Sequence, residues 1–209
     1  MFRDRVDAGR QLARRLQAEY RDSDAVVLAI ARGGVVVGNE VAKALHLPLD
    51  VIIPRKIGAP GNPELAIGAV VKGAVMLNEP LIRELNIPRS YIDREVSRQI
   101  SEIDRRRRLY LGDKAPLDLT GATVILVDDG LATGYTALAS VNAVRRENPK
   151  KLVLAVPVAP ADTCQSLKEH VDEIVCPEVH ELFFAVGQFY EVFEQTSDSE
   201  VIDILNSYR

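Results

Sequence analysis

Apolar residues recur with two different periods along this chain, and the two patterns alternate. Short runs of consecutive apolar residues are typical of strands buried on both faces of a parallel sheet, and they predict strands at Ala25–Ile30, Leu49–Pro54, Thr123–Val127, Leu152–Val158 and Glu173–Val175. Segments with an apolar residue every three or four positions predict helices at Arg3–Tyr20, Val36–Leu45, Pro88–Leu111, Thr136–Glu147, Asp162–His170 and Asp198–Tyr208. Strands that alternate with helices favour an α/β fold, with a mostly parallel sheet flanked by helices.

Two segments between the second strand and the long third helix interrupt this alternation. Arg55–Pro63 contains two glycines and two prolines, which predicts a loop. Ala66–Val71 and Ala74–Leu77 flank Lys72-Gly73 and predict a β-hairpin. The total length of 209 residues suits one domain, residues 1–209, with a sizeable core.

Composition excludes several classes of protein. The chain is 47% apolar and 27% charged, as in ordinary globular domains, and its net charge of −4 provides no overall attraction to nucleic acid or membranes. Its two cysteines, Cys164 and Cys176, are too few for a disulfide framework or a cysteine zinc site, so reduced thiols are expected. The charged N-terminus is not a secretory signal and no apolar run could span a bilayer, so we expect a cytoplasmic protein with no membrane partner.

The segment Val124–Thr136 carries most of the chemistry. Asp128 and Asp129 directly follow a buried strand, where ligands of α/β sheets collect and where two adjacent carboxylates are costly without hydroxyl donors or a cation. The loop that follows opens a helix, whose free N–H groups favour an anion, and it consists of Gly130, Leu131, Ala132, Thr133, Gly134, Tyr135 and Thr136. A phosphorylated sugar satisfies both halves: its phosphate suits the loop and its hydroxyls suit the aspartates.

This segment resembles the signature of type I phosphoribosyltransferases that binds 5-phosphoribosyl-1-pyrophosphate (PRPP): a hydrophobic strand, two acidic residues, three variable residues, then Thr-Gly-x-Thr. The resemblance implies the type I fold, with a flexible loop and a small hood that selects the acceptor. It implies that Asp128 and Asp129 hold the ribose hydroxyls during catalysis, and that Gly130–Thr136 enclose the 5-phosphate. An unrelated phosphatase or receiver domain also has an acidic strand end but would not require the glycine–threonine pattern. A Walker A site is excluded because Gly-Lys-Ser/Thr does not occur.

Two further segments match the family in chain order. Arg32, Gly33 and Gly34 follow the first strand, where the family has its pyrophosphate loop, although such a tripeptide is often only a turn. Arg55 and Lys56 precede the expected loop and are candidate catalytic and pyrophosphate ligands; a solvated surface loop is the alternative. Glu64 is a weaker candidate for a polar contact in that loop.

The hood is expected largely within residues 176–209. His180 and Phe183 are candidates to contact a base, although aromatic residues there more often pack a small subdomain. The cofactor implied by the family is Mg²⁺, bound through PRPP rather than through a protein metal site. A homodimer is implied by the resemblance alone.

The expected function is transfer of the 5-phosphoribosyl group from PRPP to a nitrogenous base, with release of pyrophosphate. The alternative is a regulatory protein that binds PRPP or a nucleotide with little turnover. Ala132 stands where enzymes acting on hypoxanthine or guanine usually have Asp, which argues against 6-oxopurines; the form of the motifs is closer to adenine enzymes, and the acceptor stays open. The run Arg105–Arg108 could suggest RNA, but a solvated or bridging helix face is the more frequent explanation, so nucleic acid is not an expected partner.

Overall fold

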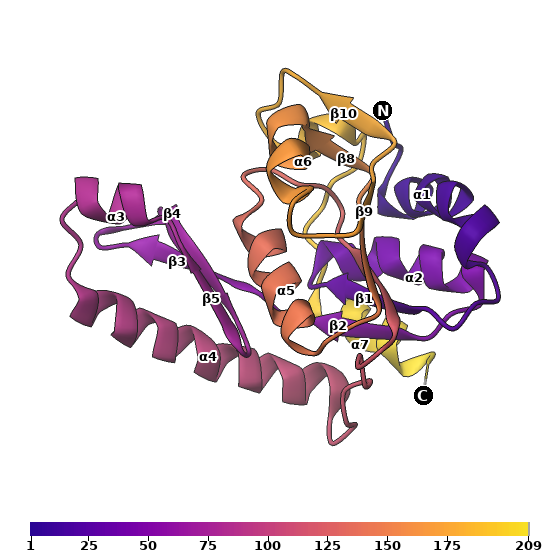
Figure 1. Ribbon diagram of the computed structural model, residues 1–209, viewed down its shortest axis with the longest axis horizontal. Coiled ribbons are helices and arrows are strands. Elements are labelled where there is room, and N and C mark those ends of the chain that lie inside the picture. Colours follow the sequence, from indigo (N-terminus) through magenta and orange to yellow (C-terminus); the bar gives the residue numbers. More distant parts are fainter. Residues whose placement is uncertain (209) are drawn as a thin grey trace.

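A five-stranded parallel sheet in the order β2-β1-β6-β7-β9 forms the centre of the molecule (Figure 1). A computed structural model describes residues 1–208. The sheet consists of β1 (Val26–Ile30), β2 (Leu49–Ile52), β6 (Thr123–Val127), β7 (Lys151–Ala155) and β9 (Glu173–Val175). Every residue of β1 and β6 is buried, as expected for strands covered on both faces. The predicted α/β fold class is confirmed.

The two faces of the sheet carry separate hydrophobic cores because side chains alternate along each strand. Val27 and Ile125 pack with α1 (Arg5–Tyr20) and α2 (Gly33–Leu45) on one face. On the other face, side chains of the neighbouring strand positions pack with α5 (Tyr135–Arg146) and α6 (Ala161–Leu167). The consecutive apolar runs in the sequence therefore serve both cores at once.

Helix α2 begins at Gly33, earlier than the predicted start at Val36. Glycines indicate a turn when only the sequence is known. Here their missing side chains let the first turn of the helix lie against the end of β6. A Cβ atom at Gly33 would overlap the Asp129 carboxylate, and one at Gly34 would lie 2.8 Å from the Val127 carbonyl oxygen.

Residues 55–111, which we call the arm, project to one side of the parallel sheet (Figure 1). The arm contains an antiparallel sheet and two helices: β3 (Arg55–Ala59), β4 (Asn62–Val71), β5 (Ala74–Leu77), α3 (Glu79–Glu84) and α4 (Arg89–Leu111). The hairpin through Lys72-Gly73 is confirmed, with Gly73 at φ 91°.

The expected loop at Arg55–Pro63 is wrong, because this stretch forms β3 and the start of β4. Arg55 pairs with Val70 and Lys56 with Ala69, so backbone pairing with a strongly apolar strand overrides the glycine and proline content. The register shifts around Gly58, and this irregularity accommodates Pro63, which has no N–H to donate. Helix α3 was not predicted, although Asn78 caps it as a typical N-cap residue.

The expected strand Leu152–Val158 is also interrupted. β7 ends at Ala155, and after Pro157 the chain enters β8 (Val158–Pro160), which pairs in parallel with β10 (Glu178–His180) in a separate small sheet. The remaining elements are a short 3-10 helix, η1 (Val186–Phe189), and α7 (Asp198–Asn206).

The segment expected as the hood has two parts in different places. β10 and η1 lie at one end of the molecule beside β8, which precedes this segment, whereas α7 packs against α2 and α4 (Figure 1). Phe2, Phe189 and Tyr190 form the buried centre of an aromatic cluster in the first part. The assignment of residues 176–209 to the hood stays a prediction.

The two cysteines, which lie in different elements, are neighbours in the structure. Cys164 of α6 and Cys176 after β9 are free thiols, and the neighbouring Cys176 side chain lowers the pKa of Cys164 to about 7, while Cys176 Sγ donates to the Glu178 carbonyl at 3.3 Å. Among the helices within residues 1–208, none has the length and apolar character needed to cross a membrane.

Candidate active site

Asp128 lies at the carboxyl end of β6, beside the first turn of α2. Its Oδ1 accepts a hydrogen bond from the Asp129 amide at 2.8 Å. Burial raises the pKa of Asp128 well above its usual range, and the negative charge of Asp129 raises it further. The carboxyl group therefore carries a free-energy cost that donors from a bound ligand would relieve.

Asp129 is held at two further points. Arg5 Nε donates to its Oδ2 at 2.7 Å, and Tyr190 Oη donates to its carbonyl oxygen at 2.6 Å. Burial raises the pKa of Asp129, while the charge and the hydrogen bond of Arg5 lower it. The sequence contains no signal for Arg5, which lies in an ordinary helix start 124 positions away.

All seven residues of the expected 5-phosphate loop line one cavity of about 170 Å³ at the N-terminus of α5. Lys56 and Ala66 of the arm and Val186 of η1 complete its wall. Gly134 has φ 77°, and a Cβ atom there would lie 2.9 Å from Thr163 Cγ2. Thr163 Oγ1 donates to the Ala132 carbonyl at 2.9 Å, so α6 holds the loop from behind. The loop thus lies at a helix start, where free N–H groups favour an anion.

A second cavity, of about 460 Å³, lies between the sheet end and the arm. Its lining includes Asp128, Arg55 and Glu64, and it shares Lys56 and Thr136 with the loop cavity, so the two spaces adjoin. The structure thus brings Asp128, the loop and the arm cations together, whereas Asp129 lines neither cavity and pairs with Arg5. The residues of α4 that sequence reasoning missed are Tyr91, Glu95, Arg98 and Gln99. Little in the sequence pointed to these residues. The helical period shows which face of α4 is apolar, but it does not show which polar residues border a cavity.

Polar contacts with α4 hold the cationic strand β3 in place. Arg55 Nε donates to Gln99 Oε1 at 2.9 Å, and Tyr91 Oη donates to the Gly58 carbonyl at 2.8 Å. Burial lowers the pKa of Arg55, and the nearby charges of Arg106, Arg98 and Arg32 contribute in the same direction. The Glu102 carboxylate acts on Arg55 in the opposite direction.

Arg32, a candidate pyrophosphate ligand, occupies the N-cap position of α2. Its Nη1 lies 3.7 Å from Asp198 Oδ1, and it does not line either cavity in this structure. In the run Arg105–Arg108, Arg105 and Arg106 both pair with Glu102, and the Arg106 side chain is only 17% exposed. Half of that cationic run is therefore ion-paired within α4.

The two candidate base contacts lie apart from both cavities. His180 stacks on Phe189 with ring centroids 4.4 Å apart, and its Nε2 lies 3.1 Å from Glu178 Oε2. Phe183 packs on the same ring at 4.9 Å. Neither residue lines the cavities beside the acidic pair, and their role toward a base stays a prediction.

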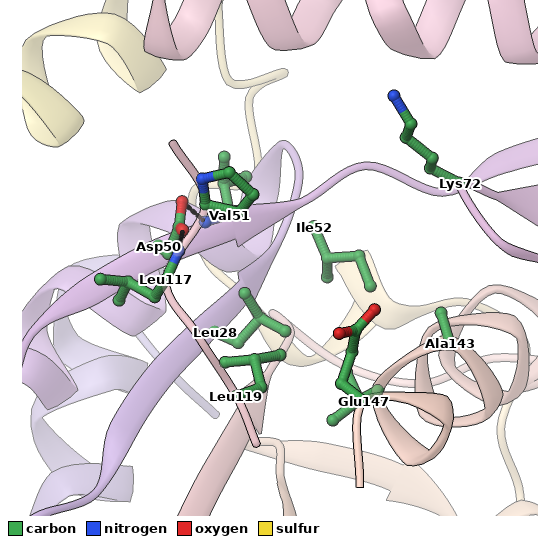
Figure 2. Close-up of a pocket in the computed structure, with 11 residues that line it drawn as sticks. Leu28, Asp50, Val51, Ile52, Lys72, Leu117, Leu119, Ala143 and Glu147 are labelled. Atoms are coloured by element: carbon green, nitrogen blue, oxygen red, sulfur yellow. Dashed lines mark hydrogen bonds between the residues drawn. The ribbon is translucent and has the colours of Figure 1, made fainter. Parts of the chain in front are cut away.

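Another cavity, of about 170 Å³, lies at the opposite end of α5 (Figure 2). It is lined mainly by apolar side chains such as Leu28, and the Asp50 carboxylate in its wall accepts hydrogen bonds from the Val51 and Leu117 amides. Lys72 extends away from the other labelled side chains in Figure 2 and pairs with Asp104 at 3.1 Å. None of the residues proposed for chemistry lines this space.

Comparison with known proteins identifies the family of this chain. The model of the phosphoribosyl transferase domain family matches residues 3–71 and 59–193. The chain belongs to this family. The phosphoribosyl transferase match spans the turn Arg32–Gly34, the arm strands, the acidic pair and its loop.

Relatives of this phosphoribosyl transferase domain are both close and distant. Two curated Mycobacterium tuberculosis proteins, named as provisional phosphoribosyl transferases, are 44% identical over 99% of the chain, which spans 46% of their length. The crystal structure of TT1426 from Thermus thermophilus is 40% identical, covers 99% of this chain and 98% of its own, and has a TM-score of 0.81. A purine phosphoribosyltransferase from Pyrococcus horikoshii is 19% identical with a TM-score of 0.51, covers 92% of this chain and 93% of its own, and shares the fold alone.

Proposed function

We propose that this domain transfers the 5-phosphoribosyl group from PRPP to a nitrogenous base and releases pyrophosphate. The observation that carries the proposal is the junction of the two cavities. One is a helix-start anion site, the other is bordered by cations, and Asp128 lines the second directly before the loop of the first. PRPP has the same order of parts: a terminal phosphate, a ring with two hydroxyls, and a pyrophosphate.

In this proposal the 5-phosphate occupies the Gly130–Thr136 loop and the ribose hydroxyls bond to Asp128 and Asp129. The pyrophosphate extends toward Arg55 and Lys56, with Arg32 nearby. These assignments place different groups at each end of the sugar, so PRPP can bind in only one direction. A carboxylate pair beside the ring also suits the positive charge that develops at C1 as the pyrophosphate leaves.

The protein's contribution to the reaction is electrostatic. The bond between C1 and the pyrophosphate oxygen breaks as the acceptor nitrogen attacks, and negative charge builds on the leaving group. Arg55 and Lys56 stabilise that charge. This arrangement favours turnover over simple binding, because a binding protein has no leaving group to stabilise.

Mg²⁺ fits this site through the substrate. No group of three or more His, Cys, Asp or Glu side chains within residues 1–208 forms a metal site, so the cation would be held by the phosphate oxygens of PRPP. When bound, it would neutralise charge on the pyrophosphate.

The test is a calorimetric titration with PRPP and Mg²⁺ of the wild type and of the double variant Asp128→Asn, Asp129→Asn. Binding to the wild type that is lost in the folded double variant would support the site. A pyrophosphate-release screen across nitrogenous bases would then separate the enzyme from a regulatory protein. Unchanged affinity in the double variant would contradict the assignment of the acidic pair.

A further inference from the structure

Arg5 connects the acidic pair to both ends of the chain. It is the first residue of α1, and its side chain is 12% exposed. Nε donates to Asp129 Oδ2 at 2.7 Å, and Nη1 donates to the Glu194 carbonyl at 2.6 Å. The guanidinium carbon lies 3.9 Å from the centroid of the Phe193 ring. Two edges and one face of the guanidinium are therefore occupied, which fixes its orientation.

This arrangement determines what Asp129 can do. A carboxylate buried beside another carboxylate tends to take up a proton, and a protonated oxygen no longer accepts two sugar hydroxyls. Arg5 opposes this tendency by a charge-assisted hydrogen bond. Asp128 instead accepts a hydrogen bond from the uncharged amide of Asp129. The two carboxylates therefore differ, because only Asp129 has a cation as its direct partner.

Close packing holds the pair formed by Asp129 and Arg5 in one arrangement. Gly33 lies so close that any side chain there would overlap both the Asp129 carboxylate and, at 2.8 Å, Arg5 Nε. Tyr190 holds the Asp129 carbonyl from the same C-terminal segment that supplies Phe193 and Glu194. Within this group of packed residues, Arg5 is the side chain that donates to the Asp129 carboxylate.

We propose that Arg5 is a positioning residue, which keeps Asp129 ionised and oriented to receive the ribose hydroxyls of PRPP. The inference rests on the proposed function, in which Asp129 contacts the sugar. It assigns no contact between Arg5 and the substrate. Lysine would retain the charge but could not reach both the carboxylate and the Glu194 carbonyl with a planar fork.

The experiment compares the affinities of PRPP and of inorganic pyrophosphate, both with Mg²⁺, by calorimetry. Arg5→Gln is expected to weaken PRPP binding about tenfold and to leave pyrophosphate binding unchanged, because only the sugar contact is lost. Arg5→Lys should recover part of the PRPP affinity. Arg10→Gln is the matched control: Arg10 lies on the same helix, pairs with Glu40 at 2.9 Å, and its loss should change neither affinity.

A double-mutant cycle with Asp129→Asn completes the test. If Arg5 acts through Asp129, Arg5→Gln should have no further effect on PRPP binding in the Asp129→Asn background. Additive losses, or equal losses of PRPP and pyrophosphate binding, would overturn the inference. If Arg5→Gln fails to fold, Arg5→Lys takes its place in the titrations with PRPP and pyrophosphate and in the double-mutant cycle.

The outcomes separate this inference from the proposed function. Weaker PRPP binding in Asp129→Asn, with none in Arg5→Gln, would overturn the role of Arg5 and leave the proposed function standing. A wild type that binds no PRPP would overturn both.

Discussion

At the carboxyl end of the parallel sheet, the acidic pair and its loop rest on strands that are buried along their whole length. The arm, by contrast, presents Arg55 and Lys56 from an antiparallel sheet backed by α4, in which five of 23 residues are buried. Its strands contact α5 through Ala69, Val71, Ala74, Ala139 and Ala143, with Met76 and Tyr135 packed beside them. In the proposed function, the sheet end therefore binds sugar and phosphate from buried parallel strands, and the arm supplies cations from an antiparallel sheet whose helix is mostly exposed.

The first prediction, with the largest expected effect, tests this comparison by replacing one glycine with alanine in each region. Gly33→Ala forces a methyl group into the Asp129 carboxylate and should weaken PRPP binding by about a hundredfold or more, because a small misplacement of a reactive group is costly. Gly61→Ala at the arm tip, where φ is 73° and nothing surrounds the site of the new methyl group, should lower the stability by about 1 kcal/mol and spare binding. Calorimetry and thermal unfolding of both variants would check this; equal affinities would show that the sheet end is not rigid.

The second prediction concerns the cations of the arm. Lys56→Ala should reduce the affinity for pyrophosphate about tenfold, since Lys56 lines both cavities and loses a charge-assisted bond. Lys72→Ala is the control: it removes the same charge from the arm, at the turn between β4 and β5, where Lys72 pairs with Asp104. A titration with pyrophosphate and Mg²⁺ that gave equal losses would indicate a general charge effect instead of a specific ligand.

The third prediction uses the pH dependence of stability to measure the cost of burying the Asp128 carboxylate at the sheet end. The pKa of Asp128 is raised in the folded state, so this group contributes stability below its unfolded pKa, and that contribution is lost as pH rises through the folded pKa. Asp128→Asn should therefore raise the melting temperature by a few degrees at pH 7, with the gain shrinking as pH falls toward 4.

Asp129→Asn gives the contrast, because it leaves the buried Arg5 without its carboxylate and should lower the melting temperature at neutral pH. Thermal unfolding across this pH range would check both variants. A melting temperature of Asp128→Asn at or below the wild-type value at pH 7 would contradict the idea that ligand binding relieves a buried charge.

The smallest effect is expected where the arm joins its own helix. Tyr91→Phe removes the hydrogen bond to Gly58 and should lower stability by about 1 kcal/mol and weaken PRPP binding a few-fold. Tyr208→Phe, which loses a 3.1 Å bond to Asn39 outside the arm, should have a similar effect on stability and none on binding. Amide exchange of β3 would report the loosening directly: unchanged protection in Tyr91→Phe would show that other contacts hold the arm.

Local patterns predicted the elements whose partners are close in the sequence or whose burial is complete. β6 and the start of α5 follow from five consecutive buried residues and a glycine–threonine loop, and both have nearly the predicted bounds. The segment Arg55–Pro63 was predicted wrongly because it becomes a strand by pairing with Ala66–Val70. A rule that considers only the residues of the segment itself does not include that pairing. The break after Ala155 could have been anticipated from Pro157, but its new partner β10 could not.

The sequence by itself determined the α/β class and the position of the acidic pair and the glycine–threonine loop at a strand end, because these depend on local spacing and on the chemistry of adjacent residues. Only the tertiary structure decided that Arg5 reaches Asp129 and that Lys56 borders the loop. It also placed His180 and Phe183 in an aromatic cluster rather than along the cavities. These contacts join residues far apart in the chain, and the packing of whole layers, which no short pattern encodes, brings them together.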